Sequence, residues 1–509
     1  MTRGNVRSVV GGRMREPHQH QPVPGRAAMR ALPLLLLFPA FLVAWPLFGA
    51  PLRDDPFPHL AGSAWVALAS VPLALVLFRT TSRTKLHARG LGTLLALWVF
   101  VALRVFLRSG TDWFEAIRAL TLVSTWPVLF LGGAQLDTHG RRALGRGLVW
   151  LSLLVTASAL VRSRFTGDLS GVLGNTGPLS QLALPGAVIG AWYVATRRGR
   201  YFLIGALAVT SFLLHAGLAP VLAGGLVFTL VLVASSLLSP WAKGRAQVRR
   251  RLGMLAALSV FGFVVLQGPR SADSPEPAAE SPVAALTRSG GNLGGVEVRL
   301  RIWRSIAPVL ASRPLLGLGP GQFQARYPRY RDPREIEASR GGVCSTRNTE
   351  ADHAHNDLLH GLAELGLVGG AIWLAFLLLS LRASLSALSQ TDFPTIGLGA
   401  GALAILFASL FHSPLWFNPP ASAVALVLFG SVLGRSRSAT RAPMRPGIAL
   451  TCLTVLLIGL FRGHLLIGHG RALAAYVESV RSAASGDPAA DPATLAATSL
   501  TRYPASAPL

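Results

Sequence analysis

A cluster of ionisable and amide side chains stands at the start of an apolar run. Residues 352–370 are DHAHNDLLHGLAELGLVGG, and they place His355, Asn356, His360 and Glu364 at or just inside the run. The last three recur every four residues, so a helix would gather them in one stripe. Histidine has a pKa near neutrality, which suits proton transfer from a hydroxyl group. We expect His355 to take or steer a proton; the alternative is a polar helix cap with a packing face.

Glu364 falls about two turns into this run. A carboxylate at that depth is costly and should face a cavity or a partner. We expect Glu364 to orient His355 or hold an acceptor, and Asn356 to bind a sugar hydroxyl or cap the helix. His353 and His355 with Asp352 raise the question of a metal, but His-x-His alone does not make a metal site. We expect neither a metal nor a cofactor.

A second cluster is basic. The stretch VEVRLRIWRSI, residues 296–306, carries Arg299, Arg301 and Arg304. The planar guanidinium matches phosphate oxygens, so these arginines would suit a pyrophosphate headgroup beside a membrane. The alternative is a basic amphipathic segment lying on lipid. The following GLGPGQ lacks the Lys-Ser/Thr of a nucleotide-binding loop, so its glycines are expected to form turns.

The elements that position both clusters are expected to be membrane helices. The chain has 509 residues, 51% of them hydrophobic, and a mean hydropathy of +0.48. We predict an all-α integral membrane protein with about 12–13 transmembrane helices and one long external loop, since a span takes roughly 20 apolar residues. The predicted spans are 31–50, 60–78, 90–107, 114–134, 143–161, 178–196, 201–216, 218–238, 252–267, 357–381, 395–411, 414–433 and 448–463.

Charge sets the predicted orientation. The net charge is +26, and the basic residues, nearly all Arg, gather in the N-terminal tail and in alternate loops. Positive loops face the cytoplasm and anionic lipids, so we expect no nucleic acid partner and place the N-terminus inside. The predicted organisation is a basic tail (1–30), spans one to nine (31–267), a periplasmic loop (268–354), spans ten to thirteen (355–463) and an external Ala-rich tail (464–509).

Four stretches resemble one family. HAHNDLLHGLAELGLVGG (353–370) is similar to the His-Asn, Leu-rich, Glu-x-Gly-x-x-Gly hallmark of the O-antigen ligase and polymerase superfamily. RLRIWRSIAPVLASRPLLGLGPGQFQARYP (299–328) resembles its Arg-x-x-x-Trp segment and glycine turn, with Arg299 in the arginine position. GVLGNTGPLSQLALPGAVIG (171–190), which contains Asn175, and FHSPLWFNPP (411–420) are weaker matches. The resemblance runs from about residue 90 to 433.

The resemblance implies glycan transfer on the outer face of the bacterial cytoplasmic membrane. The donor would be an undecaprenyl-pyrophosphate-linked glycan, and the acceptor a lipid A core sugar, another glycan or a protein hydroxyl. His355 and Arg299 would be catalytic, Arg299 by neutralising the charge that develops on the pyrophosphate. Arg301, Asn356, Glu364 and Asn175 would bind substrate. Neither metal nor nucleotide would be needed, because the pyrophosphate is already a good leaving group.

One feature of the family is missing. Its members often carry Ser-Arg-Gly near the external end of a middle span, where this chain has TSFLLHAGLAPVLAGG. Arg162 and Arg164, at the end of the fifth predicted span, are the candidates to replace that arginine. The alternative to a replacement arginine is that the donor differs from the one that the family uses.

Other functions fit part of the pattern. A repeat-unit polymerase and a protein O-oligosaccharyltransferase would use the same motif. A transporter would also have many spans, but the halves show no internal repeat and no matching pair of broken helices. An inactive scaffold is the remaining alternative, because of the missing arginine.

Overall fold

The structure is a computed structural model. It describes residues 66–71 except 69, together with 85–107, 113–166, 176–215, 218–266, 294–339, 351, 353–434, 441–443, 447–448 and 450–461. The predicted spans 31–50 and most of 60–78, and the tails 1–30 and 464–509, lie outside these residues. From 90–107 onward, each predicted span falls on a helix, as expected for an all-α membrane protein.

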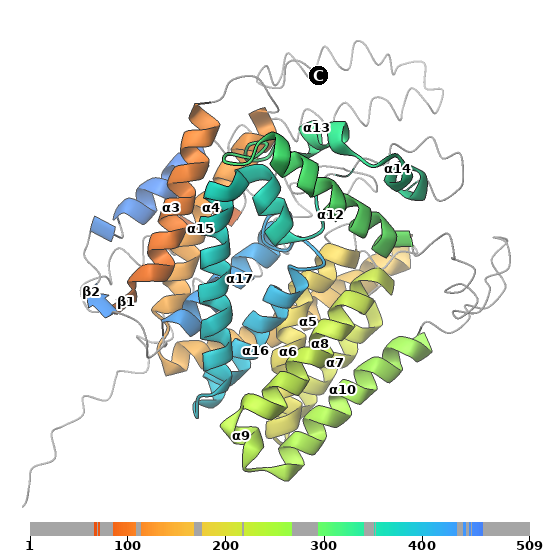
Figure 1. Cartoon of the computed structure of the whole chain (residues 1–509). Helices are drawn as coiled ribbons and strands as arrows, with labels where there is room; N and C mark the ends of the chain where they lie inside the picture. The colour runs from red at the N-terminus through yellow and green to blue at the C-terminus, as the bar shows by residue number, and fades with distance from the viewer. Residues whose placement is uncertain are drawn as a thin grey trace, which may run out of the picture.

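Helices make up nearly all of the described chain (Figure 1). Two three-residue strands, β1 (Lys85–His87) and β2 (Arg441–Pro443), pair antiparallel. The helices are α3 (Ala88–Phe106), α4 (Trp113–Ala134), α5 (Thr138–Thr166), α6 (Thr176–Thr196), α7 (Arg200–His215), α8 (Leu218–Leu238), α9 (Pro240–Lys243), α10 (Ala246–Leu266), α12 (Gly294–Ser312), α13 (Phe323–Arg326), the 3-10 helix η3 (Tyr327–Tyr330), α14 (Pro333–Ser339), α15 (Asp357–Leu388), α16 (Phe393–Ala408), α17 (Pro419–Leu433) and the apolar helix Leu450–Phe461.

Five of the described helices are long and apolar enough to cross a bilayer, namely those at Arg89–Phe106, Trp113–Ala134, Thr138–Leu160, Gly177–Thr196 and Asp357–Leu388. Two of them, α4 and α6, are 94% buried over the apolar window, whereas α3 is 39% buried. Large apolar side chains such as Leu103, Trp150 and Leu378 are exposed on the outer helices. The described bundle therefore has an inner layer around α4, α6, α16 and α17 and an apolar outer surface suited to lipid.

Glycine allows the inner helices to approach closely. A Cβ on Gly133 of α4 or on Gly430 of α17 would collide with backbone carbonyls of the opposite helix. A Cβ on Gly186 of α6 would collide with the carbonyl of Leu148 in α5. Small residues at such crossings are typical of membrane helix packing, where backbones contact each other directly.

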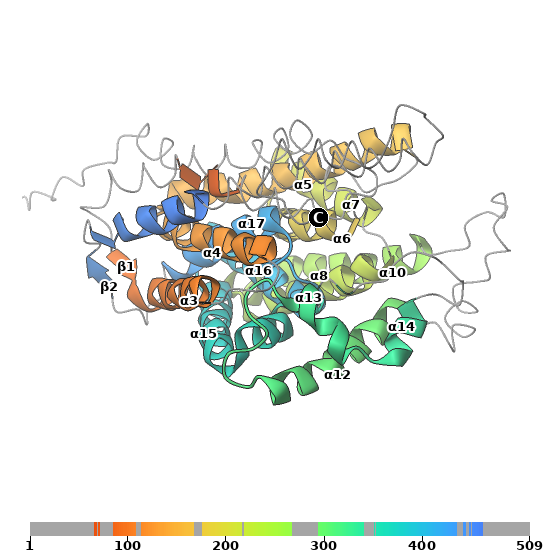
Figure 2. The same cartoon turned by 90° about the horizontal axis from the view of Figure 1, so that it is seen from above.

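The segment α12–α14 lies outside the bundle and covers one end of α15. Figure 2 shows α12, α13 and α14 on the side of the bundle where α15 lies. Ile306 and Val309 of α12 are buried with Phe323, Tyr327 and Ala363 in a small apolar core of their own. The arginine stretch 296–306 lies within α12, and the turns expected at the GLGPGQ glycines are confirmed.

A glycine break divides α15 into a short arm and a long one. Gly366 has φ +64°, which is not helical, and the helix continues on both sides of it. A Cβ there would lie 2.5 Å from the Gly317 nitrogen, because the turn before α13 presses against the break. Backbone bonds join the two: Leu318 N–H donates to Ala363 O (2.9 Å), and Leu367 N–H donates to Pro314 O (2.8 Å). The short arm, 357–365, is thereby fixed beneath the segment that carries the arginines.

Candidate active site

The site is built around the first residues of α15. Asn356 caps the helix, since its Oδ1 accepts from Leu359 N–H at 2.9 Å, and its Nδ2 donates to Leu410 O at 2.9 Å. Of its two expected roles, the cap is the one that the structure contains. The predicted stripe is also confirmed, because Asn356, His360 and Glu364 are all buried.

Asp357 is a buried residue that the sequence did not single out. Its carboxylate is fully buried and accepts from the backbone N–H groups of Leu415 (3.0 Å) and Trp416 (3.3 Å). These bonds hold residues 411–418 in a loop, so α17 begins at Pro419, capped by Asn418, rather than at the predicted 414. The sequence pattern that could have indicated Asp357 is a carboxylate between a capping Asn and an apolar run.

His355 has an unusual backbone conformation. Its φ is +50°, and it is the one non-glycine residue at positive φ in the part of the chain that the structure describes. The left-handed region is unfavourable for residues with a Cβ, and such conformations concentrate at functional sites. The half-buried His355 ring lies 4.0 Å from the His353 ring, centroid to centroid.

Helix α12 brings the arginine segment to this histidine loop. The Trp303 indole N–H donates to Ala354 O at 2.8 Å, between His353 and His355. Arg299 lies one turn earlier on the same face of α12. Burial lowers its pKa, and no carboxylate of the described residues forms an ion pair with it. Arg299 is therefore a partly desolvated cation beside the histidines.

Arg299 also acts on the loop before α17. The pKa of His412 is lowered to about 3, first by burial and then by the positive charge of Arg299 and by His353. His412 is consequently a neutral imidazole near Arg299 and His353. Three segments far apart in sequence thus meet at one place: α12, the histidine loop and residues 411–418.

Aromatic rings form the floor of the cluster. The Phe417 ring stacks on the His353 ring, with 4.6 Å between centroids. It packs against the His360 ring in a T-shaped arrangement, with 5.0 Å between centroids. Below them, Trp416 contacts Trp126 of α4 at 5.2 Å and Trp373 of α15 at 5.6 Å. The histidines therefore rest on a rigid apolar base that joins α4, α15 and the 411–418 loop.

The hydrogen-bond partners of Glu364 are backbone groups, which differ from the partners expected from the sequence. Its Oε2 accepts from Gly321 N–H at 2.8 Å, and its Oε1 accepts from Phe323 N–H at 2.9 Å. The Nε2 of His360 lies 3.5 Å from Oε2. Both carboxylate oxygens thus hold the glycine turn in place, which assigns Glu364 a positioning role in the described structure.

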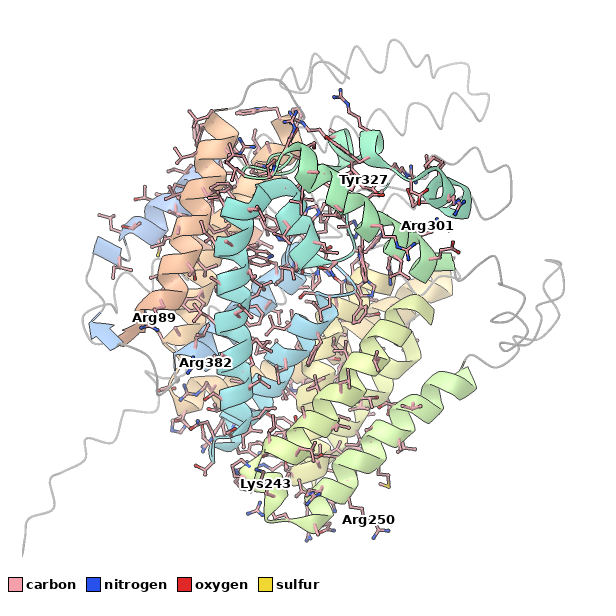
Figure 3. The ribbon with its side chains drawn as sticks, viewed as in Figure 1. Arg89, Lys243, Arg250, Arg301, Tyr327 and Arg382 are labelled. Atoms are coloured by element: carbon pink, nitrogen blue, oxygen red, sulfur yellow. The ribbon has the colours of Figure 1, made fainter. Side chains whose placement is uncertain are left out.

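Arg301 is also engaged by protein groups. Its guanidinium donates to Glu297 (Nε–Oε1 2.9 Å) and to Asp332 (Nη1–Oδ2 3.2 Å). These contacts raise the Arg301 pKa; the pKa of Asp332 is lowered by the Arg334 backbone N–H and by Arg301. Arg301 thereby ties α12 to the segment before α14, and Arg304 is exposed. Figure 3 shows Arg301 on this segment near Tyr327.

A buried arginine that the sequence did not single out lies beneath the cluster. Arg118 of α4 donates to Glu115 at 2.6 Å and to Trp416 O at 2.8 Å. Its Cζ lies 4.5 Å from the centre of the Phe417 ring, which is within cation–π range. The Glu-x-x-Arg spacing inside an apolar run was the available signal. Arg118 thereby ties the 411–418 loop to α4.

Three predicted substrate-binding residues stay predictions. Asn175 lies outside the described residues, and of Arg162 and Arg164 only the backbone, at the end of α5, is described. Within the described residues no group of three or more His, Cys, Asp or Glu side chains is placed to hold a metal ion.

Two comparisons with known proteins bear on the site. Residues 172–374 match the family model described as O-antigen ligase. This range contains Arg299, Trp303 and the histidine loop, and it ends inside α15. No curated protein matches the chain. Over residues 172–374, the chain is therefore similar to the O-antigen ligase family.

Proposed function

We propose that this protein is a membrane glycosyltransferase of the O-antigen ligase type. It transfers a glycan from an undecaprenyl-pyrophosphate carrier to an acceptor hydroxyl. A lipid A core sugar, another glycan or a protein hydroxyl would serve as acceptor. The observation that carries the proposal is Arg299, a half-buried cation without a carboxylate partner among the described residues, one helical turn from Trp303, whose indole bonds to Ala354 between His353 and His355.

The chemistry follows from the two kinds of side chain. The acceptor oxygen attacks the anomeric carbon of the donor, and the bond from that carbon to the phosphate oxygen breaks. His355 accepts the hydroxyl proton as the new glycosidic bond forms. The carrier leaves as a lipid pyrophosphate, and Arg299 stabilises the charge that grows on it. Because the leaving group is stable as an anion, the step needs no acid to protonate it.

The remaining residues position these two. Asn356 and Asp357 fix the start of α15 and the 411–418 loop, and Trp303 fixes Ala354. Glu364 fixes the glycine turn that precedes α13. A preorganised site of this kind gains rate because little reorganisation is needed during the reaction. Asn175, Arg162 and Arg164 remain proposed substrate contacts on the basis of the resemblance.

We also propose the orientation that charge predicts, with the N-terminus in the cytoplasm and residues 268–354 and the site in the periplasm. The two ends of the described bundle differ in a way that supports it. Lys243 and Arg250 lie at one end, whereas Arg301 and Tyr327 lie at the other (Figure 3). Positively charged loops remain on the cytoplasmic side.

The lipid-linked glycans of cells that lack this gene test the proposal. The cells would be complemented with wild type, His355→Ala or Arg299→Ala, and the carrier-bound glycans separated by size. For a ligase, long glycans accumulate on the carrier, and wild type clears them but neither variant does. A repeat-unit polymerase would instead leave single repeats on the carrier.

Two controls sharpen the result. Arg304→Ala removes an exposed arginine on the same helix and should complement like wild type. Membrane levels of each variant, measured by immunoblot, separate lost chemistry from lost protein. An unchanged glycan profile in the deletion strain, or full complementation by both site variants, would contradict the proposed transfer.

A further inference from the structure

His412 is a buried histidine with an unsatisfied nitrogen. His412 is 7% exposed. Its Nε2 is buried and has no hydrogen-bond partner among the described residues. A buried polar atom without a partner costs roughly 1–3 kcal/mol, so native structures retain few of them. An atom of this kind beside a reaction site calls for a partner that arrives with the substrate.

The position of His412 is fixed by the loop that carries it. Its backbone N–H donates to Ala408 O at 2.9 Å, at the end of α16. On either side, Leu410 O accepts from Asn356 and the Leu415 N–H donates to Asp357. The backbone that carries the imidazole is therefore fixed next to the start of α15, and burial limits the freedom of the ring.

Arg299 and His353 are the charged or titratable groups that act on His412. Burial first, and then the charge of Arg299 and His353, lower the pKa of His412 to about 3, so its imidazole is neutral at physiological pH. A neutral imidazole has one N–H donor. It can stand next to the Arg299 guanidinium without the repulsion that a second cation would bring.

We propose that Nε2–H of His412 donates a hydrogen bond to a phosphate oxygen of the lipid pyrophosphate that Arg299 binds. This assigns His412 to the donor-binding site, and it rests on the proposed function. The ligand chemistry is a diphosphate ester. Its oxygens are acceptors only, so they match one charged donor, the half-buried Arg299, and one neutral donor, the buried His412. The pair recognises the leaving group without taking part in proton transfer to the acceptor.

Binding of undecaprenyl pyrophosphate to the full-length protein in detergent micelles tests the assignment, with native mass spectrometry as the readout. Because one hydrogen bond to a charged group is lost, we expect His412→Leu to weaken binding by roughly tenfold or more. His412→Gln places an amide nitrogen near the position of Nε2 and should restore most of the affinity. His412→Asn places its amide nearer to Nδ1 and should behave like His412→Leu.

Controls separate the contact from damage to the loop. Ser409→Ala alters a buried residue at the C-cap of α16, three positions before His412, whose Oγ bonds only to Leu406 O at 2.7 Å in the described structure, and should bind like wild type. The contrast between the Gln and Asn variants holds even where His412→Leu fails to fold. Competition by inorganic pyrophosphate would assign recognition to the phosphate oxygens. If inorganic pyrophosphate did not compete but the Gln and Asn variants still differed, recognition would be assigned to the whole lipid headgroup.

Each failure has its own meaning. Wild-type affinity in His412→Leu, or equal loss in the Gln and Asn variants, overturns the role of His412 while Arg299→Ala still weakens binding. Equal displacement by phosphatidylglycerol would also overturn it, because the site would then recognise any anionic lipid. If the wild-type protein binds no undecaprenyl pyrophosphate and Arg299→Ala changes nothing, the proposed function itself fails.

Discussion

The polar residues of the proposed site divide into those that we propose to face the reaction and those whose contacts hold other groups in place. His355 and Arg299 have the features of the first group: one has a strained backbone, and the other is a half-buried cation without a carboxylate partner in the described residues. Asn356, Asp357 and Glu364 belong to the second, because their side chains bond to backbone groups. Polar residues of one motif therefore serve different purposes one or two positions apart.

The conformation of His355 predicts opposite effects on stability and activity. A non-glycine residue at φ +50° costs on the order of 1 kcal/mol or more, which glycine avoids. His355→Gly should therefore melt at the same temperature as wild type or higher, while glycan transfer is lost. Thermal unfolding in detergent and the carrier-glycan profile measure the two effects. A large fall in melting temperature would show that the ring contributes more to folding than the strain removes.

Substitution of Glu364 should have the reverse effect: stability should fall first, and activity with it. Its removal leaves the buried Gly321 and Phe323 N–H groups without an acceptor, at roughly 1–3 kcal/mol for each. Glu364→Ala should lower the melting temperature strongly, and activity should fall with the amount of folded protein. Glu297→Ala, which removes a partly exposed carboxylate from an ion pair with Arg301, is the matched control and should change stability little. If Glu364→Ala were as stable as wild type but did not transfer glycan, Glu364 would belong with the residues that face the reaction.

At the scale of elements, the fold depends on a junction between a turn and a broken helix. The turn at 313–322 bonds to α15 on both sides of Gly366, and the Arg104 guanidinium of α3 donates to Leu316 O at 3.0 Å. Gly317, Gly319, Gly321 and Gly366 all have positive φ. Glycine is needed here for its backbone freedom and for close approach at the same time.

Alanine at this junction should be severe. In Gly366→Ala the Cβ would lie 2.5 Å from backbone atoms of Gly317 and Leu315, at a φ that alanine disfavours, so the turn and the short arm of α15 must separate. We expect loss of transfer and a clear fall in melting temperature. Gly253→Ala in α10 is the control: its Cβ would meet nothing within 4 Å, and alanine favours helices. Equal tolerance of both substitutions would mean that the junction does not set the site.

At the scale of the whole molecule, the described bundle has chemically different ends. The proposed site and its arginine segment lie at one end, and Lys243 and Arg250 lie at the other (Figure 3). An enzyme that receives a lipid-linked donor needs its site at a membrane surface rather than at the midplane. The position of α12–α14 over the end of α15 meets that need.

Cysteine labelling tests this orientation. In a variant with Cys344 and Cys452 replaced by serine, Arg329→Cys in η3 and Arg250→Cys in α10 each place one exposed thiol at opposite ends. An impermeant maleimide should label position 329 in cells whose outer membrane alone is opened. Position 250 should react only after the inner membrane is also permeabilised. The opposite order would place the histidine loop in the cytoplasm and exclude a periplasmic transfer.

The sequence alone determined the helical membrane class and most helix positions, because apolar runs and turn residues are local signals; the spans predicted at 218–238 and 114–134 match α8 and α4 within one residue. It also predicts His355 and Arg299 as the reacting residues, which the complementation experiment tests. Tertiary structure decided what each polar residue binds. The hydrogen-bond partners of Asp357 and Glu364 lie some 40 to 60 positions away in sequence, and the charge that acts on His412 comes from Arg299, still farther along the chain, so no local pattern shows them. The later start of α17 has the same cause, since it depends on a carboxylate in α15 that captures the preceding loop.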